Sequence, residues 1–167
     1  KAPRIVELDR SYSEQNLKYD IAQVRALRAF AYFYMVRIWG DVPLVTYSYD
    51  NGTFPSMPRT DAQTVLSYAK AELLTAIKDL PYQYGTQTNL YYGSYGAQWQ
   101  GKLFNKLSAY SVLAHICAWQ GNYAEAETYS AFIIDHASEI NAKYTSIADL
   151  TSETGLFYSN ASVKGSR

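Results

Sequence analysis

Residues 96–102, with the sequence GAQWQGK, match the first seven positions of a loop that holds phosphate groups in nucleotide-binding proteins. At the next position such a loop has a serine or threonine whose hydroxyl binds magnesium, whereas this chain has Leu103. A phosphate loop also follows a buried strand, and here tyrosine, glycine and serine precede it. We therefore predict no nucleotide site and no cofactor.

Histidines and carboxylates form no pattern typical of a catalytic or metal site. His115 and His136 are the only histidines, and neither has carboxylates or thiolates at ligand spacing around it. His115 is predicted to be a hydrogen-bonded residue in a helix interface, and Asp41, in a turn, to bind local backbone amides. Glycoside hydrolysis needs two carboxyl groups placed across one bond, and the acidic residues are scattered. We therefore expect no metal site and no enzymatic activity.

Tyrosine is the most unusual part of the composition, with 17 residues in a chain of 167. One segment concentrates aromatic residues among glycine, serine and glutamine: Tyr91, Tyr92, Tyr95 and Trp99. Flat apolar rings then alternate with flexible, hydrogen-bonding positions, the combination through which proteins bind sugar rings. We predict a ligand-binding site at these four residues. The alternative is that their rings pack back onto the helices and close the domain.

The bulk properties exclude several classes of protein. The 15 Lys and Arg residues balance the 15 Asp and Glu residues without clustering, which argues against nucleic-acid or anionic-membrane binding. Cys117 is the only cysteine and is predicted to be a buried structural residue. The sequence opens at Lys1 without a signal segment, a lipid-attachment cysteine or a membrane-spanning apolar run. Both ends resemble cut points, so we expect residues 1–167 to be a single domain within a longer protein.

Apolar residues recur with helical spacing in four stretches, and no alternating strand pattern rivals them. The predicted helices cover about 13–39, 60–80, 102–120 and 122–137. Thr60 and Gln63 are expected to form a capping box at the second helix, and Asn122 with Glu125 to cap the fourth. The residues predicted to face inward are Leu17, Ile21, Val24, Leu27, Phe30, Ala31, Tyr34, Met35 and Ile38 on the first helix, Ala62, Val65, Leu66, Ala69, Leu73, Ile77 and Leu80 on the second, Leu103, Leu107, Tyr110, Leu113, Ala114 and Cys117 on the third, and Tyr123, Ala126, Tyr129, Ile133 and Ala137 on the fourth.

These helices predict an all-α fold of two antiparallel pairs stacked side by side. The third and fourth helices have the small residues and the Gly121 turn of a tetratricopeptide repeat. Two long loops, 43–59 and 81–101, interrupt the regular pattern, and loops of this length inside a compact domain are usually functional or disordered. Gly40 follows the first helix directly, where the chain often needs a positive φ.

The block RAFAYF at residues 28–33, followed by WGDVPL at residues 39–44, resembles the SusD/RagB family of outer-membrane nutrient-binding lipoproteins. The resemblance spans nearly all of the chain. Its framework positions are Arg28, Tyr32, Trp39, Gly40, Asp41 and Pro43. The resemblance implies a tetratricopeptide-like helical section with inserted loops, in which these six residues form a structural motif. We predict that Trp39, Gly40, Asp41 and Pro43 act as a folding element and not as a contact site.

The resemblance also implies a function. Members of this family capture glycans at the bacterial cell surface without cleaving them, and they deliver oligosaccharides to a SusC-like TonB-dependent outer-membrane transporter. The expected partners are that transporter and a polysaccharide or oligosaccharide, with no nucleic acid and with membrane contact only through a lipid anchor that this chain lacks. The second hypothesis is a tetratricopeptide-type protein–protein adaptor. The two long loops and the block at residues 28–44 favour the glycan-binding hypothesis. Neither feature identifies the glycan.

Overall fold

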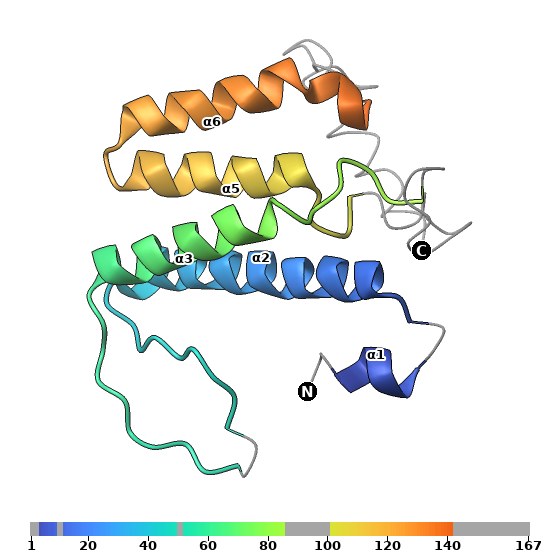
Figure 1. Cartoon of the computed structure of the whole chain (residues 1–167). Helices are drawn as coiled ribbons and strands as arrows, with labels where there is room; N and C mark the ends of the chain where they lie inside the picture. The colour runs from blue at the N-terminus through green and yellow to red at the C-terminus, as the bar shows by residue number, and fades with distance from the viewer. Residues whose placement is uncertain (1–3, 10–11, 50–51, 86–100, 142–167) are drawn as a thin grey trace, which may run out of the picture. The chain divides into compact units, whose positions relative to one another are not determined.

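The computed structural model describes residues 4–9, 12–49, 52–85 and 101–141. The helices in these ranges are α1 (Ile5–Leu8), α2 (Glu14–Trp39), α3 (Ala62–Ala76), α5 (Lys106–Trp119), α6 (Tyr123–Asp135) and the 3-10 helix η3 (Ala137–Ile140) (Figure 1). The only extended pairing in the described part of the chain is an isolated antiparallel bridge between Val42 and Thr60. The predicted all-α class is therefore confirmed.

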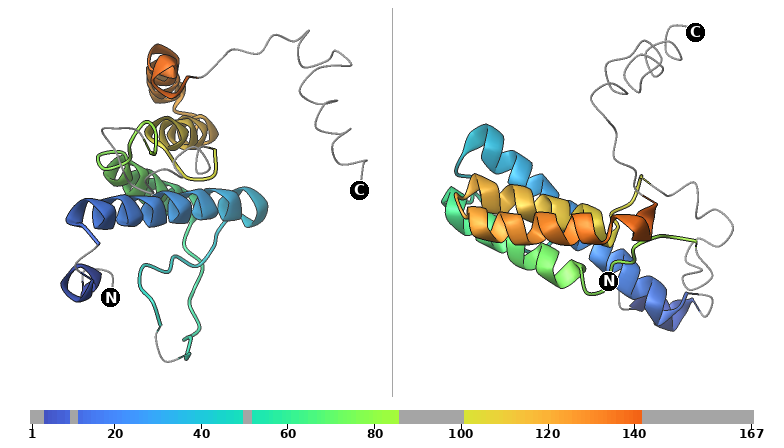
Figure 2. Two further views of the ribbon diagram at one scale, coloured as in Figure 1. Left: turned by 90° about the vertical axis from the view of Figure 1, so that its right-hand side faces the viewer. Right: turned by 90° about the horizontal axis from the view of Figure 1, so that it is seen from above.

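Residues 1–136 form one compact unit and residues 137–167 another, to which η3 belongs. The prediction of a single domain over 1–167 stays a prediction. Within the first unit, α2 packs against α3, α5 packs against α6, and α3 contacts α5. The helices of each pair run in opposite directions (Figures 1 and 2). The predicted arrangement of two stacked antiparallel pairs is confirmed.

Side chains that accept backbone hydrogen bonds set the starts of the long helices. Ser13 Oγ accepts from the Asn16 amide at 3.1 Å at the start of α2, as the predicted boundary requires. At α3 the predicted capping box is wrong, because Asp61 Oδ1 accepts from the Thr64 amide at 2.9 Å. Thr60 instead pairs through its backbone with Val42. Its position is set by the loop that precedes the helix.

The second helix pair begins with two further caps. A reciprocal capping box between Asn105 and Ser108 starts α5, a few residues later than the predicted start at Lys102. Asn122 Oδ1 accepts from the Glu125 amide at 3.3 Å at the start of α6, as predicted. Serine and asparagine are common at the position that caps the start of a helix because their short polar side chains reach backbone amides that lack helical partners.

The buried face of α2 differs from the predicted one. Its buried residues are Ala22, Ala26, Ala29, Tyr32, Phe33 and Val36. Val24, Leu27 and Ile38 were predicted to face inward, but they are 60–64% exposed. The contact with α3 uses small residues on both sides, including Ala69 and Ala76 of α3, which let two helices approach closely. Phe30 and Met35 do pack against the core as predicted, but a prediction based on large apolar residues missed the alanine face that contacts α3.

The faces predicted for the other helices are largely confirmed. Six of the positions predicted on the second helix are buried: Val65, Leu66, Ala69, Leu73, Ile77 and Leu80. Cys117 on α5 is fully buried, and desolvation raises the pKa of its thiol, so it is a structural residue as predicted. The prediction that Tyr123 faces inward on α6 is wrong, because this residue is 72% exposed. It is the first residue of its helix, where little of the neighbouring helix remains to cover it.

The amide of Gln23 on α2 fixes the chain just before α5. Its Nε2 donates to the backbone oxygen of Phe104 at 2.5 Å, and its Oε1 accepts from the Phe104 amide at 3.0 Å. The hydroxyl of Tyr84 also donates to that oxygen, at 2.9 Å. The two Gln23 bonds join residues 81 positions apart and attach the second helix pair to the first. No helix in the described ranges has the length and apolar character needed to cross a membrane.

Candidate functional site

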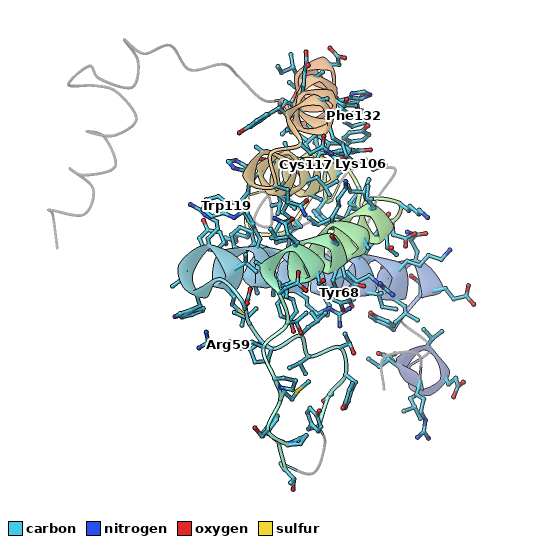
Figure 3. The ribbon with its side chains drawn as sticks, turned by 90° about the vertical axis from the view of Figure 1, so that its left-hand side faces the viewer. Arg59, Tyr68, Lys106, Cys117, Trp119 and Phe132 are labelled. Atoms are coloured by element: carbon cyan, nitrogen blue, oxygen red, sulfur yellow. The ribbon has the colours of Figure 1, made fainter. Side chains whose placement is uncertain are left out.

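The framework residues predicted from the sequence connect α2, α3 and the loop between them. Glu72 of α3 is only 8% exposed and accepts hydrogen bonds from both Arg25 and Arg28 of α2. The Arg28 guanidinium also lies 5.6 Å from the ring centre of Tyr68, which Figure 3 shows on α3. A buried carboxylate needs such cationic partners to offset its lost hydration. Arg28 therefore holds the first helix pair together.

Tyr32 anchors the loop that follows α2. Its hydroxyl accepts from the Val45 amide at 2.7 Å and donates to the Val45 oxygen at 3.0 Å. Its ring meets the ring of Tyr68 edge to face, with centroids 5.9 Å apart. The Tyr32 hydroxyl thus satisfies both backbone groups of Val45, which a neighbouring strand would satisfy in a sheet.

The turn after α2 has a conformation that glycine favours. Gly40 has φ +70° and ψ −119°, which confirms the predicted positive φ. Asp41 Oδ1 accepts from the amide of Ala62 at 2.9 Å, so it binds the start of α3. The prediction of a bond to local amides is wrong, because this bond spans 21 positions in the sequence. Trp39 is 61% exposed and Pro43 is partly buried.

The predicted ligand-binding residues Tyr91, Tyr92, Tyr95 and Trp99 lie outside the described residues, so that site stays a prediction.

The structure describes both histidines. His115 is exposed on α5 and therefore does not lie in a helix interface, contrary to expectation. His136 stacks on Phe132, with ring centroids 4.0 Å apart, and on Tyr82 at 5.9 Å. In the described part of the chain, no group of His, Cys, Asp and Glu residues could hold a metal ion.

A second aromatic group, which we call the 47–54 cluster, lies on the loop between α2 and α3. It consists of Tyr47, Tyr49 and Phe54. Ring centroids are 4.8 Å apart for Tyr47 and Tyr49 and 5.5 Å apart for Tyr49 and Phe54. Phe54 is 74% exposed and Tyr47 is 62% exposed, whereas Tyr49 is partly buried between them. In Figure 1 the loop extends away from both helix pairs.

The polar atoms of the 47–54 cluster lie at the edges of its rings. The Tyr49 hydroxyl donates to the Tyr47 hydroxyl at 2.7 Å and lies 3.7 Å from Met57 Sδ. The hydrogen bond with Tyr47 raises the pKa of Tyr49, so this phenol keeps its proton at physiological pH. Within residues 43–59 only Asp50 and Arg59 carry charge, and Figure 3 shows Arg59 close to the start of α3. The cluster offers apolar faces and neutral hydroxyls to a ligand.

Sequence reasoning did not select the 47–54 cluster, because the segment 91–99 has more aromatic residues at closer spacing. A weaker signal was present. Residues two positions apart in an extended segment point to the same side, and Tyr47 and Tyr49 have that spacing. Phe54 reaches them only because the loop reverses direction, which a local pattern does not predict.

A cavity of about 260 Å³ lies along the N-terminal half of α2. Its walls combine the apolar residues Ile5, Leu17, Ile21 and Val24 with Tyr12 and Asp20, whose hydroxyl and carboxylate are hydrogen-bonded to each other. Arginines also line it, but Glu72 engages both of them. Small-molecule sites usually enclose about 300–1,000 Å³ and include convergent polar groups. The cavity is therefore a weaker candidate for ligand binding than the exposed rings.

Comparison with known proteins places the fold. No protein-family model matches the chain. A SusD-like protein of Formosa agariphila is 30% identical over 131 residues, which are 77% of this chain and 21% of that protein. A crystal structure of a SusD superfamily protein from Bacteroides thetaiotaomicron is 99% identical over 99% of this chain, with a TM-score of 0.85. The chain spans 36% of that structure's length.

A third relative is a solved laminarin-binding SusD-like protein. It is 26% identical, with a TM-score of 0.58, over 70% of this chain and 23% of its own. Near-identity to the Bacteroides thetaiotaomicron protein extends over almost every residue of this chain and so includes both helix pairs. The chain belongs to the SusD superfamily.

Proposed function

We propose that this protein binds glycans at the outer surface of the bacterial outer membrane and does not cleave them. The observation that carries the proposal is membership of the SusD superfamily, in which a relative similar over 70% of this chain is named for laminarin binding. The exposed, neutral rings of the 47–54 cluster agree with such a ligand. Loops on a rigid scaffold commonly hold binding residues.

We further propose that the bound oligosaccharide passes to a SusC-like TonB-dependent transporter, and that a lipid anchor outside residues 1–167 holds the protein at the membrane. The resemblance in the block at residues 28–44 supports both statements. Balanced charge supports an uncharged ligand over a nucleic acid.

The segment 91–99 remains the proposed ligand site. Each aromatic contact of Tyr91, Tyr92, Tyr95 or Trp99 with a sugar would contribute on the order of 1 kcal/mol. After the entropy cost of association, dissociation constants of ~10 μM to millimolar are expected. Weak contacts suffice for a polymer, because its many repeating units allow rebinding.

Native affinity electrophoresis of the full-length protein in gels containing laminarin, xylan or soluble starch tests this proposal. We expect retardation by at least one of them. Trp99→Ala should weaken it several-fold while the helical CD spectrum stays unchanged, and Tyr123→Ala, an exposed ring on α6, is the matched control. Unchanged binding by Trp99→Ala and by the combined Tyr91, Tyr92 and Tyr95 alanine variant would move the site elsewhere.

A further inference from the structure

We propose that the 47–54 cluster is a second sugar-contact site, separate from the segment 91–99, which takes uncharged pyranose rings of a polysaccharide. The inference rests on the proposed glycan-binding function and assigns residues to it. It depends on three properties of the described loop: exposure of the rings, support of the loop at its two ends, and the chemistry of the groups that the rings present.

Exposure is the first property. Tyr47 and Phe54 leave most of their surface in water although each ring could stabilise the fold if buried. Grouped exposed rings of this kind mark binding surfaces, in contrast to single exposed apolar residues. Tyr49 lies between them and contacts both. The three rings therefore form one connected group, with ring planes inclined at 49° between Tyr47 and Tyr49 and at 63° between Tyr49 and Phe54.

Rigid support is the second property. The two ends of the loop are joined by the backbone bonds between Val42 and Thr60, at 3.2 Å and 3.0 Å. Tyr32 holds Val45, and Asp41 holds the start of α3. Pro55 and Pro58 further restrict the returning segment. A surface ordered before the ligand arrives loses less entropy on binding.

Surface chemistry is the third property and indicates the class of ligand. A pyranose presents C–H groups on its faces and hydroxyls around its rim, which complement aromatic faces and phenol edges. Tyr47 and Tyr49 supply such edges, and their mutual hydrogen bond fixes where they lie. In the sequence of residues 43–59, Arg59 is the only cation that could pair with a carboxylate or sulfate on the ligand, and it lies five positions beyond Phe54, next to α3. Neutral polysaccharides therefore fit this surface better than anionic ones.

The test uses the full-length protein in affinity gels containing laminarin, soluble starch, xylan or the anionic polygalacturonate. The variant Tyr47→Ala/Phe54→Ala removes the two exposed rings and keeps Tyr49. We expect the neutral polysaccharide that the wild type binds to retard this variant several-fold less than the wild type. The melting temperature should stay unchanged. Tyr123→Ala removes a similarly exposed ring from α6 and should leave retardation unchanged.

The outcomes separate the two proposals. A wild-type protein that binds none of these polysaccharides contradicts the proposed function and this inference together. If the wild type binds a polysaccharide and the double variant binds it equally well, this inference alone is overturned. A protein partner is then the remaining occupant for the rings. Preference for polygalacturonate would overturn the uncharged ligand class. If the double variant melts at a lower temperature, the single variant Phe54→Ala is used for the binding test instead. Phe54 is 74% exposed, so its removal should leave the fold intact.

Discussion

At the scale of single residues, Gly40 is the position where backbone geometry matters most. An added Cβ would meet no atom within 4 Å, so space does not restrict the residue. The conformation does, because φ +70° with ψ −119° is costly for any residue with a side chain. We therefore expect Gly40→Val to lower the free energy of unfolding by about 1 kcal/mol or more.

Urea denaturation measures this loss for Gly40→Val. Ser67→Ala, an exposed change on α3, is the control and should unfold with the wild type. A Gly40→Val protein that unfolds with the wild type but loses ligand would show that the turn is a contact site and not a folding element.

Glu125 gives a residue-scale prediction with a pH dependence. Its Oε1 lies 2.5 Å from Lys70 Nζ, and Tyr129 donates to the same oxygen at 3.0 Å. The hydrogen bond with Lys70 lowers the pKa of Glu125 below its ordinary value of 4.5. A lowered pKa means that the contact stabilises the fold above that value and that this stabilisation is lost as pH falls through the lowered pKa.

Glu125→Gln should therefore lower the melting temperature at neutral pH, and the difference from the wild type should shrink on acidification well below 4.5. The effect will be small, because the pair is partly exposed and screened by water. Glu127→Gln on the exposed face of α6 is the control. A difference that stays constant across the whole pH range would assign the loss to packing instead of charge.

At the scale of elements, the loop that carries the 47–54 cluster depends on a helix it does not belong to. Tyr32→Phe keeps the ring against Tyr68 but removes both hydrogen bonds to Val45. We expect a loss of about 1 kcal/mol, typical of hydrogen bonds in proteins. Amide exchange at Val45 should accelerate, while the core amides of α2 and α3 keep their protection. Tyr34→Phe, on a half-exposed ring of the same helix, is the control. Unchanged exchange at Val45 would contradict the anchoring role.

The four long helices α2, α3, α5 and α6 could be predicted from the sequence, because each has apolar residues at helical spacing and a capping side chain near its start. The short helices α1 and η3 were not predicted. Two elements show where such reasoning fails. The face of α2 was misassigned, since alanines at positions 22, 26 and 29 contribute little to an apolar pattern but determine how closely α3 approaches. The cap of α3 was misassigned to Thr60, whose backbone pairing with Val42 is a contact between distant segments.

At the scale of the whole molecule, the block at residues 28–44 allowed the family to be predicted because its residues act together. Arg28 reaches Glu72, Tyr32 reaches Val45 and Asp41 reaches Ala62, so a short motif specifies the joining of two helices and a loop. The 47–54 cluster could not be predicted in the same way. Phe54 contacts Tyr49 from five positions further along the chain, a contact that no local spacing pattern predicts.

The central claim is that this protein captures glycans without cleaving them. The most direct measurement incubates the full-length protein with laminarin, xylan and soluble starch, and follows both protein retained on the polysaccharide and reducing ends released into solution. We predict retention on at least one polysaccharide, with reducing ends that do not increase over a protein-free control. Release of reducing ends in proportion to protein would contradict the account by showing an enzyme, and no retention on any polysaccharide would contradict glycan binding itself.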